Sequence, residues 1–154
     1  MLVIVGKSTP NKENGDVELY LRDFQKKLDS AGKFVYAWSF NPDESAIRLL
    51  ETSIETDEDI YIYLPYDGKK ALIRMKVQGF HHNRSGVPRC PMKWQNYCIE
   101  GLNGHQEWGV HIWFLITKIE NMQQPVELLD SFSPVFSNKY KNWGQNYFAF
   151  LHGG

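Results

Sequence analysis

Seven basic side chains within one acid-free stretch are the residues of this chain best suited to binding chemistry. Between Gly68 and Ile99 the sequence contains no aspartate or glutamate, whereas the segment from Asp43 to Asp59 holds seven acids against Arg48 alone. Lysine and arginine neutralise phosphates, so a run of this kind predicts a surface that faces an anion. The candidates for phosphate contacts are Lys69, Lys70, Arg74, Lys76, Arg84, Arg89 and Lys93.

Catalytic chemistry has much less support in the sequence. It contains no Gly-x-Ser-x-Gly motif, no phosphate-binding Gly-Lys-Ser/Thr loop, no dinucleotide fingerprint and no His-Glu-x-x-His motif. Four histidines (His81, His82, His105 and His111) are not at ligand spacing on any expected element, and each is best interpreted as a surface or hydrogen-bonded side chain. We therefore expect a protein that is not an enzyme and needs no cofactor, although missing motifs do not exclude an active site of another kind.

The two cysteines, Cys90 and Cys98, are too few and too oddly spaced for a zinc motif, even with His81 and His82 nearby. We expect no metal, and free thiols in a reducing cytosol. The apolar run from Leu2 to Val5 is too short for a signal peptide or a membrane span. It predicts a strand in a soluble, cytoplasmic protein.

Length and composition set the scale of the fold. A chain of 154 residues is expected to form one domain, covering 1–154, with a core large enough to be stable without cross-links. Aromatic residues make up 14% of the chain and include five Trp, so they form either the core or a binding surface. The net charge of -1 by itself predicts neither a nucleic-acid binder nor its opposite.

The elements that must position these residues are organised around a predicted hairpin from Asp59 to Phe80. Its first arm alternates Ile60, Ile62 and Leu64 with two tyrosines, which is the period-two pattern of a half-buried strand. Pro65 to Gly68 supply the turn. In the second arm we expect one face to be core and the other to carry positive charge; the core face comprises Ala71, Ile73, Met75 and Val77, and the charged face Lys70, Leu72, Arg74 and Lys76.

The remaining elements follow from periodicity and from Gly and Pro breaks. We expect strands at 2–5, 33–40 and 108–119, helices at 16–31 and 44–52, a short strand or turn at 125–129, and a final segment at 139–151. The stretch 81–106 is interrupted by Gly and Pro and is expected to be a long, functional loop that carries Trp94. About six or seven strands and two or three helices in mixed order indicate an α+β fold with a strongly curved sheet or small barrel.

The order of these elements resembles a known superfamily. A strand ends in aromatic-Ser-x-Asn-Pro at Tyr36–Pro42 and a short helix follows; then come the strands Asp59–Tyr63 and Lys69–Val77, a variable loop, and the segment Trp113–Val126. This pattern is similar to the PUA-like superfamily, particularly its EVE and YTH branches, which are small pseudo-barrels that hold a modified or flipped base in an aromatic cage. The resemblance spans residues 34–150, but the Trp-Asp-Gly-Val-Arg-Asn segment typical of EVE proteins is missing after Pro42.

The resemblance implies roles for particular residues. Trp94 and Trp108 match a loop Trp followed by a Trp that opens the next strand, and Trp38 comes from the aromatic strand before the proline. Ser39 and Asn41 are the neighbouring hydrogen-bonding candidates. An extruded base offers a π-face for stacking and an edge for hydrogen bonds, so these five residues are the expected base-binding set. The competing interpretation is that Trp residues at strand spacing belong to the core.

The function implied by the resemblance is recognition of a modified, most plausibly methylated, base in DNA by base flipping into the cage. Such domains target prokaryotic modification-dependent restriction systems that contain a GTP-driven motor and a nuclease, and a chain that ends in Leu-His-Gly-Gly could be one such domain excised from a longer protein. Two alternatives stay open: an RNA-binding EVE- or ASCH-like protein, and an enzyme that acts on nucleotides through the same pocket. The identity of the modification is not encoded in any pattern of the sequence.

Overall fold

The computed structural model describes residues 1–6, 16–38, 41–65, 70–87, 90–99, 110–135 and 149–153. Within them the elements are β1 (Leu2–Val5), α1 (Asp16–Ala31), β2 (Phe34–Trp38), α2 (Glu44–Glu55), β3 (Ile60–Pro65), β4 (Lys70–Val87), the 3-10 helix η2 (Met92–Tyr97), β5 (Val110–Glu127), α3 (Leu128–Ser131), β6 (Ser133–Pro134) and β7 (Ala149–His152). The fold is therefore α+β, as predicted.

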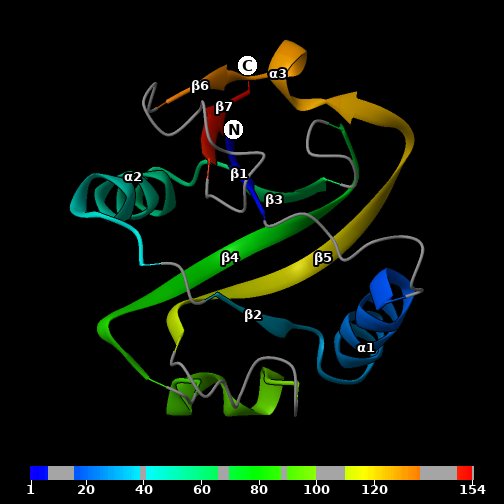
Figure 1. The fold of residues 1–154 in the computed structure, drawn as a ribbon. Coiled ribbons are helices and arrows are strands. Elements are labelled where there is room, and N and C mark those ends of the chain that lie inside the picture. The colour runs from blue at the N-terminus through cyan, green and yellow to red at the C-terminus, as the bar shows by residue number, and fades with distance from the viewer. Residues whose placement is uncertain are drawn as a thin grey trace.

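A single mixed sheet organises the described part of the chain (Figure 1). Its seven strands lie in the order β2-β5-β4-β3-β1-β7-β6. The pair β1 and β3 is parallel and the other pairs are antiparallel. The two longest strands, β4 and β5, have 18 residues each and cross the molecule side by side. They connect the part of the sheet near α1 and β2 with the part near α3, β6 and β7.

Three hydrophobic clusters pack the helices and strands against one another. The first lies on one sheet face and takes buried residues from both long helices, including Phe24 of α1 and Leu50 of α2. Phe24 stacks on Phe34 of β2 at 4.6 Å between ring centroids. The second cluster packs β1, β3 and β7 against α3. The third packs η2 against β2 and β5.

The end of α1 and the start of α2 follow from local chemistry. The predicted stop of α1 at Ala31-Gly32 is confirmed: Gly32 has φ +80° and its amide donates to Leu28 O at 2.8 Å, a glycine-type helix end. At α2, the carboxylate of Asp43 accepts the amide of Ala46 at 3.0 Å, which is an N-cap. The helix continues to Glu55, three residues beyond the predicted end.

The predicted hairpin forms, but its first arm is buried on both faces. All six residues of β3 are buried, whereas a half-buried strand was expected. The reason is that hydrophobic clusters cover both faces of the sheet at this central strand. Ile60, Ile62 and Leu64 enter the first cluster, and Tyr61 and Tyr63 enter the second.

The second arm departs from strict alternation. The register between β3 and β4 shifts at Leu64 and Pro65, and that between β4 and β5 shifts between Ala71 and Ile73. A bulge of this kind moves the following side chains to the other face. Ala71 therefore lies in the second cluster while Met75 and Val77 lie in the first, which corrects the prediction of one shared core face.

Three further predictions were wrong. The stretch 81–106 is not one long loop, because β4 runs through Val87 and η2 follows at Met92–Tyr97. The expected strand ending at residue 119 continues to Glu127, and the expected short strand or turn at 125–129 contains the end of β5 and the start of α3. The predicted turn at 66–68 and residues 139–148 of the last predicted segment lie outside the described residues.

Candidate functional site

An open groove lies between the N-terminal end of α2 and the far part of β4. It has a volume of about 470 Å³ and is lined by Asn41, Pro42, Asp43, Glu44, Ile47, Arg48, Glu51, His82 and Arg84. The end of β2 leads directly into it, since β2 stops at Trp38 and α2 begins at Glu44. Two residues from the predicted sets, Asn41 and Arg84, thus come together here, although they are separated by 43 positions in the chain.

An amide and an imidazole form the polar centre of this groove. The distance between Asn41 Oδ1 and His82 Nε2 is 2.7 Å. A carbonyl oxygen only accepts, so His82 Nε2 carries the proton and donates. Burial, followed by the nearby Arg84, His111 and His81, lowers the pKa of His82 below its ordinary value. The ring is therefore neutral at pH 7, which leaves Nδ1 as an acceptor, while the amide nitrogen of Asn41 carries two donor hydrogens.

His82 and Arg48 were not among the predicted site residues. His82 was interpreted as a surface side chain because its spacing to other histidines fits no metal site. The pairing that gives it a role is with Asn41, 41 positions away in the chain. Arg48 lies in the acidic run, and its place in the groove follows only from the packing of α2 against β4.

The cations of the groove already have carboxylate partners. Arg84 Nη2 lies 2.6 Å from Glu44 Oε1, and Arg48 lies 4.0 Å from the same carboxylate. The hydrogen bond and charge of Arg84, and then the charge of Arg48, lower the pKa of Glu44. A ligand phosphate would have to exchange with this carboxylate. The groove is thus a polar site of nearly balanced charge rather than a basic patch.

The predicted phosphate residues of the hairpin are also paired with acids. Lys70 lies 3.5 Å from Glu127 and Lys76 lies 3.6 Å from Asp59. Arg74 binds Glu120 through Nε. The partners are contributed largely by β5, which pairs Lys70 with Glu127 and Arg74 with Glu120 across the ladder. An acid-free stretch of sequence therefore does not form an acid-free surface. Two further predicted phosphate residues, Lys69 and Arg89, lie outside the described residues.

Trp94 occupies a buried position on η2. It is 9% exposed and belongs to the third cluster together with the fully buried Trp113. Lys93 Nζ lies 4.9 Å from the centroid of its ring, and His81 approaches it edge-on with 6.4 Å between centroids. Trp113 is a core residue, with no exposed surface. Stacking of a base on Trp94 would require η2 to move.

The groove and Trp94 lie on opposite faces of the sheet. In the β4–β5 ladder His82 pairs with Ile112, and Ile112 belongs to the first cluster. The preceding residue, His81, pairs with Trp113 of the third cluster. The described residues therefore do not bring Trp94 together with Asn41. The backbone of Trp38 pairs with Ile112, whereas the side chain of Trp38 and the whole of Ser39 and Trp108 lie outside the described residues.

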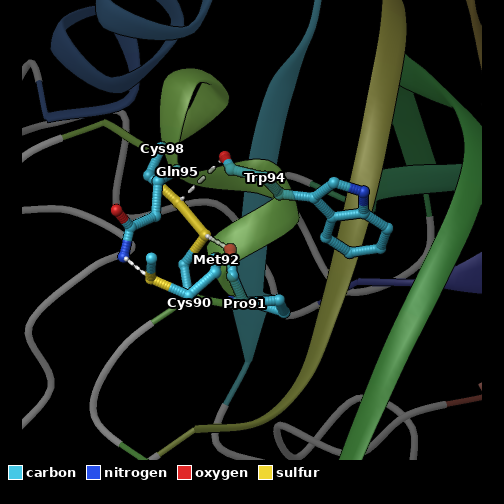
Figure 2. Close-up of a disulfide and its surroundings, with 6 residues drawn as sticks. All are labelled: Cys90, Pro91, Met92, Trp94, Gln95 and Cys98. Carbon is cyan, nitrogen blue, oxygen red and sulfur yellow. Dashed lines mark hydrogen bonds between the residues drawn. A yellow bond between two sulfur atoms is a disulfide. The ribbon is translucent and has the colours of Figure 1, made fainter.

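The prediction of free thiols is wrong. Cys90 and Cys98 form a disulfide that brackets η2, as Figure 2 shows. Cys90 is 7% exposed and packs in the third cluster with Trp94, and Cys98 is partly buried against the same cluster. The spacing of eight residues gave no indication of this pairing, because it depends on the turn that η2 makes. Within the described ranges no cysteine is free.

The described part of the chain lacks two other kinds of feature, a cluster of metal ligands and a membrane-spanning helix. There, no three His, Cys, Asp or Glu side chains are grouped as ligands for a metal ion. No helix among the described residues has both the length and the hydropathy needed to cross a bilayer. Compared with protein-family models, curated proteins and solved structures, the chain matches none of them.

Proposed function

We propose that this chain is a DNA-binding module of PUA-like fold that recognises a modified base extruded from the duplex. The groove at the N-terminal end of α2 is the site that holds the base edge. The protein acts in the cytoplasm, and its partners there are the GTP-driven motor and the nuclease of a modification-dependent restriction system. The proposal rests on the sequence resemblance, and the α+β fold with one mixed sheet is compatible with it.

One observation carries this proposal: the Asn41–His82 pair faces an open groove. The amide of Asn41 offers two donors, and the neutral ring of His82 offers an acceptor. Base edges consist of adjacent donors and acceptors, and asparagine is a common partner of the adenine N6 and N7 positions. Although Asn41 is exposed, a donor–acceptor set of this kind can discriminate a base by hydrogen bonding, without a strong overall positive charge.

The charge pairs set an expectation for the salt dependence of binding. Each phosphate contact made by a free lysine or arginine steepens the dependence of affinity on salt by about one unit. Here Arg84, Lys70 and Lys76 are each paired with a carboxylate of the same chain, which a phosphate must displace. We therefore expect a shallow salt slope, smaller than the number of basic residues suggests.

The experiment is a binding titration with fluorescent oligonucleotides, with and without base methylation, as duplex DNA, single-stranded DNA and RNA. Asn41→Ala should weaken binding of the modified duplex by about 5- to 150-fold, equivalent to about 1–3 kcal/mol, and should leave the melting temperature unchanged. Gln78→Ala is the matched control, because Gln78 is an exposed residue of β4 that does not line the groove.

Each other outcome has a definite meaning. Equal losses for modified and unmodified duplexes would show that the groove does not read the modification. Tighter binding of RNA than of any DNA would replace the proposal by the RNA-binding alternative. Turnover of the oligonucleotide in the same tubes, abolished by His82→Ala, would identify an enzyme.

A further inference from the structure

The disulfide closes a short loop around a buried tryptophan. Cys90 and Cys98 are eight residues apart and join the two ends of η2. Trp94 lies within this loop and is 9% exposed against the third cluster. Two backbone hydrogen bonds shape the turn: Trp94 N donates to Pro91 O at 2.9 Å and Cys98 N donates to Gln95 O at 3.3 Å. Trp94 is thus held by its packing on β2 and β5 and by a turn that the S–S bond closes.

Each sulfur also lies beside a carbonyl oxygen of the same loop. Cys90 Sγ is 3.4 Å from Pro91 O and Cys98 Sγ is 3.6 Å from Trp94 O, the dashed contacts in Figure 2. Disulfide sulfurs carry no hydrogen, so neither contact is a hydrogen bond in the oxidised protein. In the dithiol, both S–H groups would find an acceptor already in place. The surroundings of this pair therefore suit both redox states.

We propose that Cys90 and Cys98 form a reversible redox site, reduced by a dithiol, whose state controls how readily η2 and Trp94 leave the sheet. The two sulfurs differ in access, since Cys90 is buried and Cys98 is partly buried. The thiolate of the reductant attacks Cys98 Sγ, the S–S bond breaks, and Cys90 leaves as a thiolate. The second thiol of the reductant then displaces Cys98, which yields two protein thiols and one oxidised, cyclic reductant.

The two electrons come from the dithiol, and the two protons that its thiols release end on the protein sulfurs. Loss of the cross-link restores conformational entropy to the open loop, so the opening equilibrium of η2 shifts by roughly 10- to 100-fold. Trp94 lies on the opposite face of the sheet from the groove of the proposed function, so opening of η2 does not add a stacking surface to that groove. The redox site itself is independent of that function.

Hydrogen exchange of the folded protein, with and without dithiothreitol, tests the site directly. The amides of Trp94 and Cys98 should exchange roughly 10- to 100-fold faster in the reduced protein, while amides of β5 such as Trp113 keep their rate. Thiol titration under native conditions should count two thiols after reduction and none after reoxidation. The variant C90A/C98A should match the reduced protein and ignore dithiothreitol.

If the bond resists dithiothreitol until the protein is denatured, the disulfide is only a structural staple and the proposal fails. Equal exchange rates in both redox states overturn it as well. If the double variant does not fold, the native sequence with and without reductant still decides the matter. Oligonucleotide affinity measured in both states separates the two proposals, because a redox effect on exchange without any oligonucleotide binding refutes only the proposed function.

Discussion

The guanidinium of Arg74 lies over the ring of Tyr61, with 4.0 Å between its central carbon and the ring centroid. Its Nη1 also donates to the hydroxyl of Tyr63 at 3.1 Å, and its Nε binds Glu120. The side chain is only 25% exposed. A residue expected to contact phosphate is thus part of the packed face of the sheet, where cation–π and charge-assisted bonds fix its position.

Arg74→Ala should lower the free energy of unfolding by about 1–3 kcal/mol, because it removes a half-buried cation–π contact and leaves Glu120 without its main partner. Arg74→Lys should recover only part of this, since an ammonium cannot reproduce the planar stack and fork. Urea unfolding measures both. Arg48→Ala is the control, because its side chain is 79% exposed and its loss should cost no more than about 0.5 kcal/mol. Equal effects of Arg74→Ala and Arg48→Ala would contradict this account.

Glu120 predicts a dependence of stability on acid pH. Burial by itself raises its pKa, but the hydrogen bonds from Arg74 and Lys118 outweigh burial and hold the pKa below its ordinary value. The unfolded chain therefore binds the proton first as pH falls. The stabilisation is complete above the ordinary glutamate pKa of about 4.3 and is lost as pH falls from there through the folded pKa. The difference in unfolding free energy between the native protein and Glu120→Gln should shrink from pH 6 to pH 3; a constant difference would exclude this role.

The N-cap of α2 gives a third prediction, which concerns the stability of the helix that lines the groove. Asp43→Ala removes the acceptor of the Ala46 amide and should cost about 1 kcal/mol of stability, within the usual 0.5–2 kcal/mol range for caps. Asp43→Asn should cost much less, because its side-chain oxygen still accepts that bond. Thermal melting followed by circular dichroism compares them. If Asn and Ala behave alike at this position, the carboxylate acts through charge rather than as a cap.

Trp94 is expected to behave as a core residue in the disulfide form. Trp94→Ala should cost about 3–5 kcal/mol by opening a cavity in the third cluster. Met92 is the matched control, since it lies two positions away on η2 and is 81% exposed; Met92→Ala should change stability by less than about 0.5 kcal/mol. Chemical denaturation without reductant measures both. If the two variants are equally stable, Trp94 is not a core residue and the role in base binding that the resemblance implies is favoured instead.

The elements that depend on local sequence were predictable. The strand at Leu2–Val5, the helix that ends before Gly32 and the alternation of Ile60, Ile62 and Leu64 all follow from spacing and from the permissive backbone of glycine. The mixture of helices and strands likewise indicated the α+β class. In these segments each residue's preference agrees with its tertiary position.

The rest depends on which residues meet across the sheet. The shift between Ala71 and Ile73, the carboxylates opposite Lys70 and Arg74, and the pairing of Cys90 with Cys98 are set by strand register and by the turn of η2. None leaves a periodic trace in sequence. The same holds for the groove, where Asn41 was implied by the resemblance but His82 is brought to it only by the packing of β4 beside α2.

The position of β1 has a consequence for synthesis of the chain. Leu2 pairs with Ile60 of β3 on one side and with His152 of β7 on the other. β1 therefore needs two partner strands that lie far from it in the sequence. At typical rates of about 5–20 residues per second, β7 follows β1 by about 7–30 s on the ribosome. During that interval one edge of β1, made of Leu-Val-Ile-Val, lacks its ladder partner. An apolar strand edge that stays unpaired for this long is prone to pair with the wrong strand. We therefore expect the nascent protein to bind chaperones until β7 emerges.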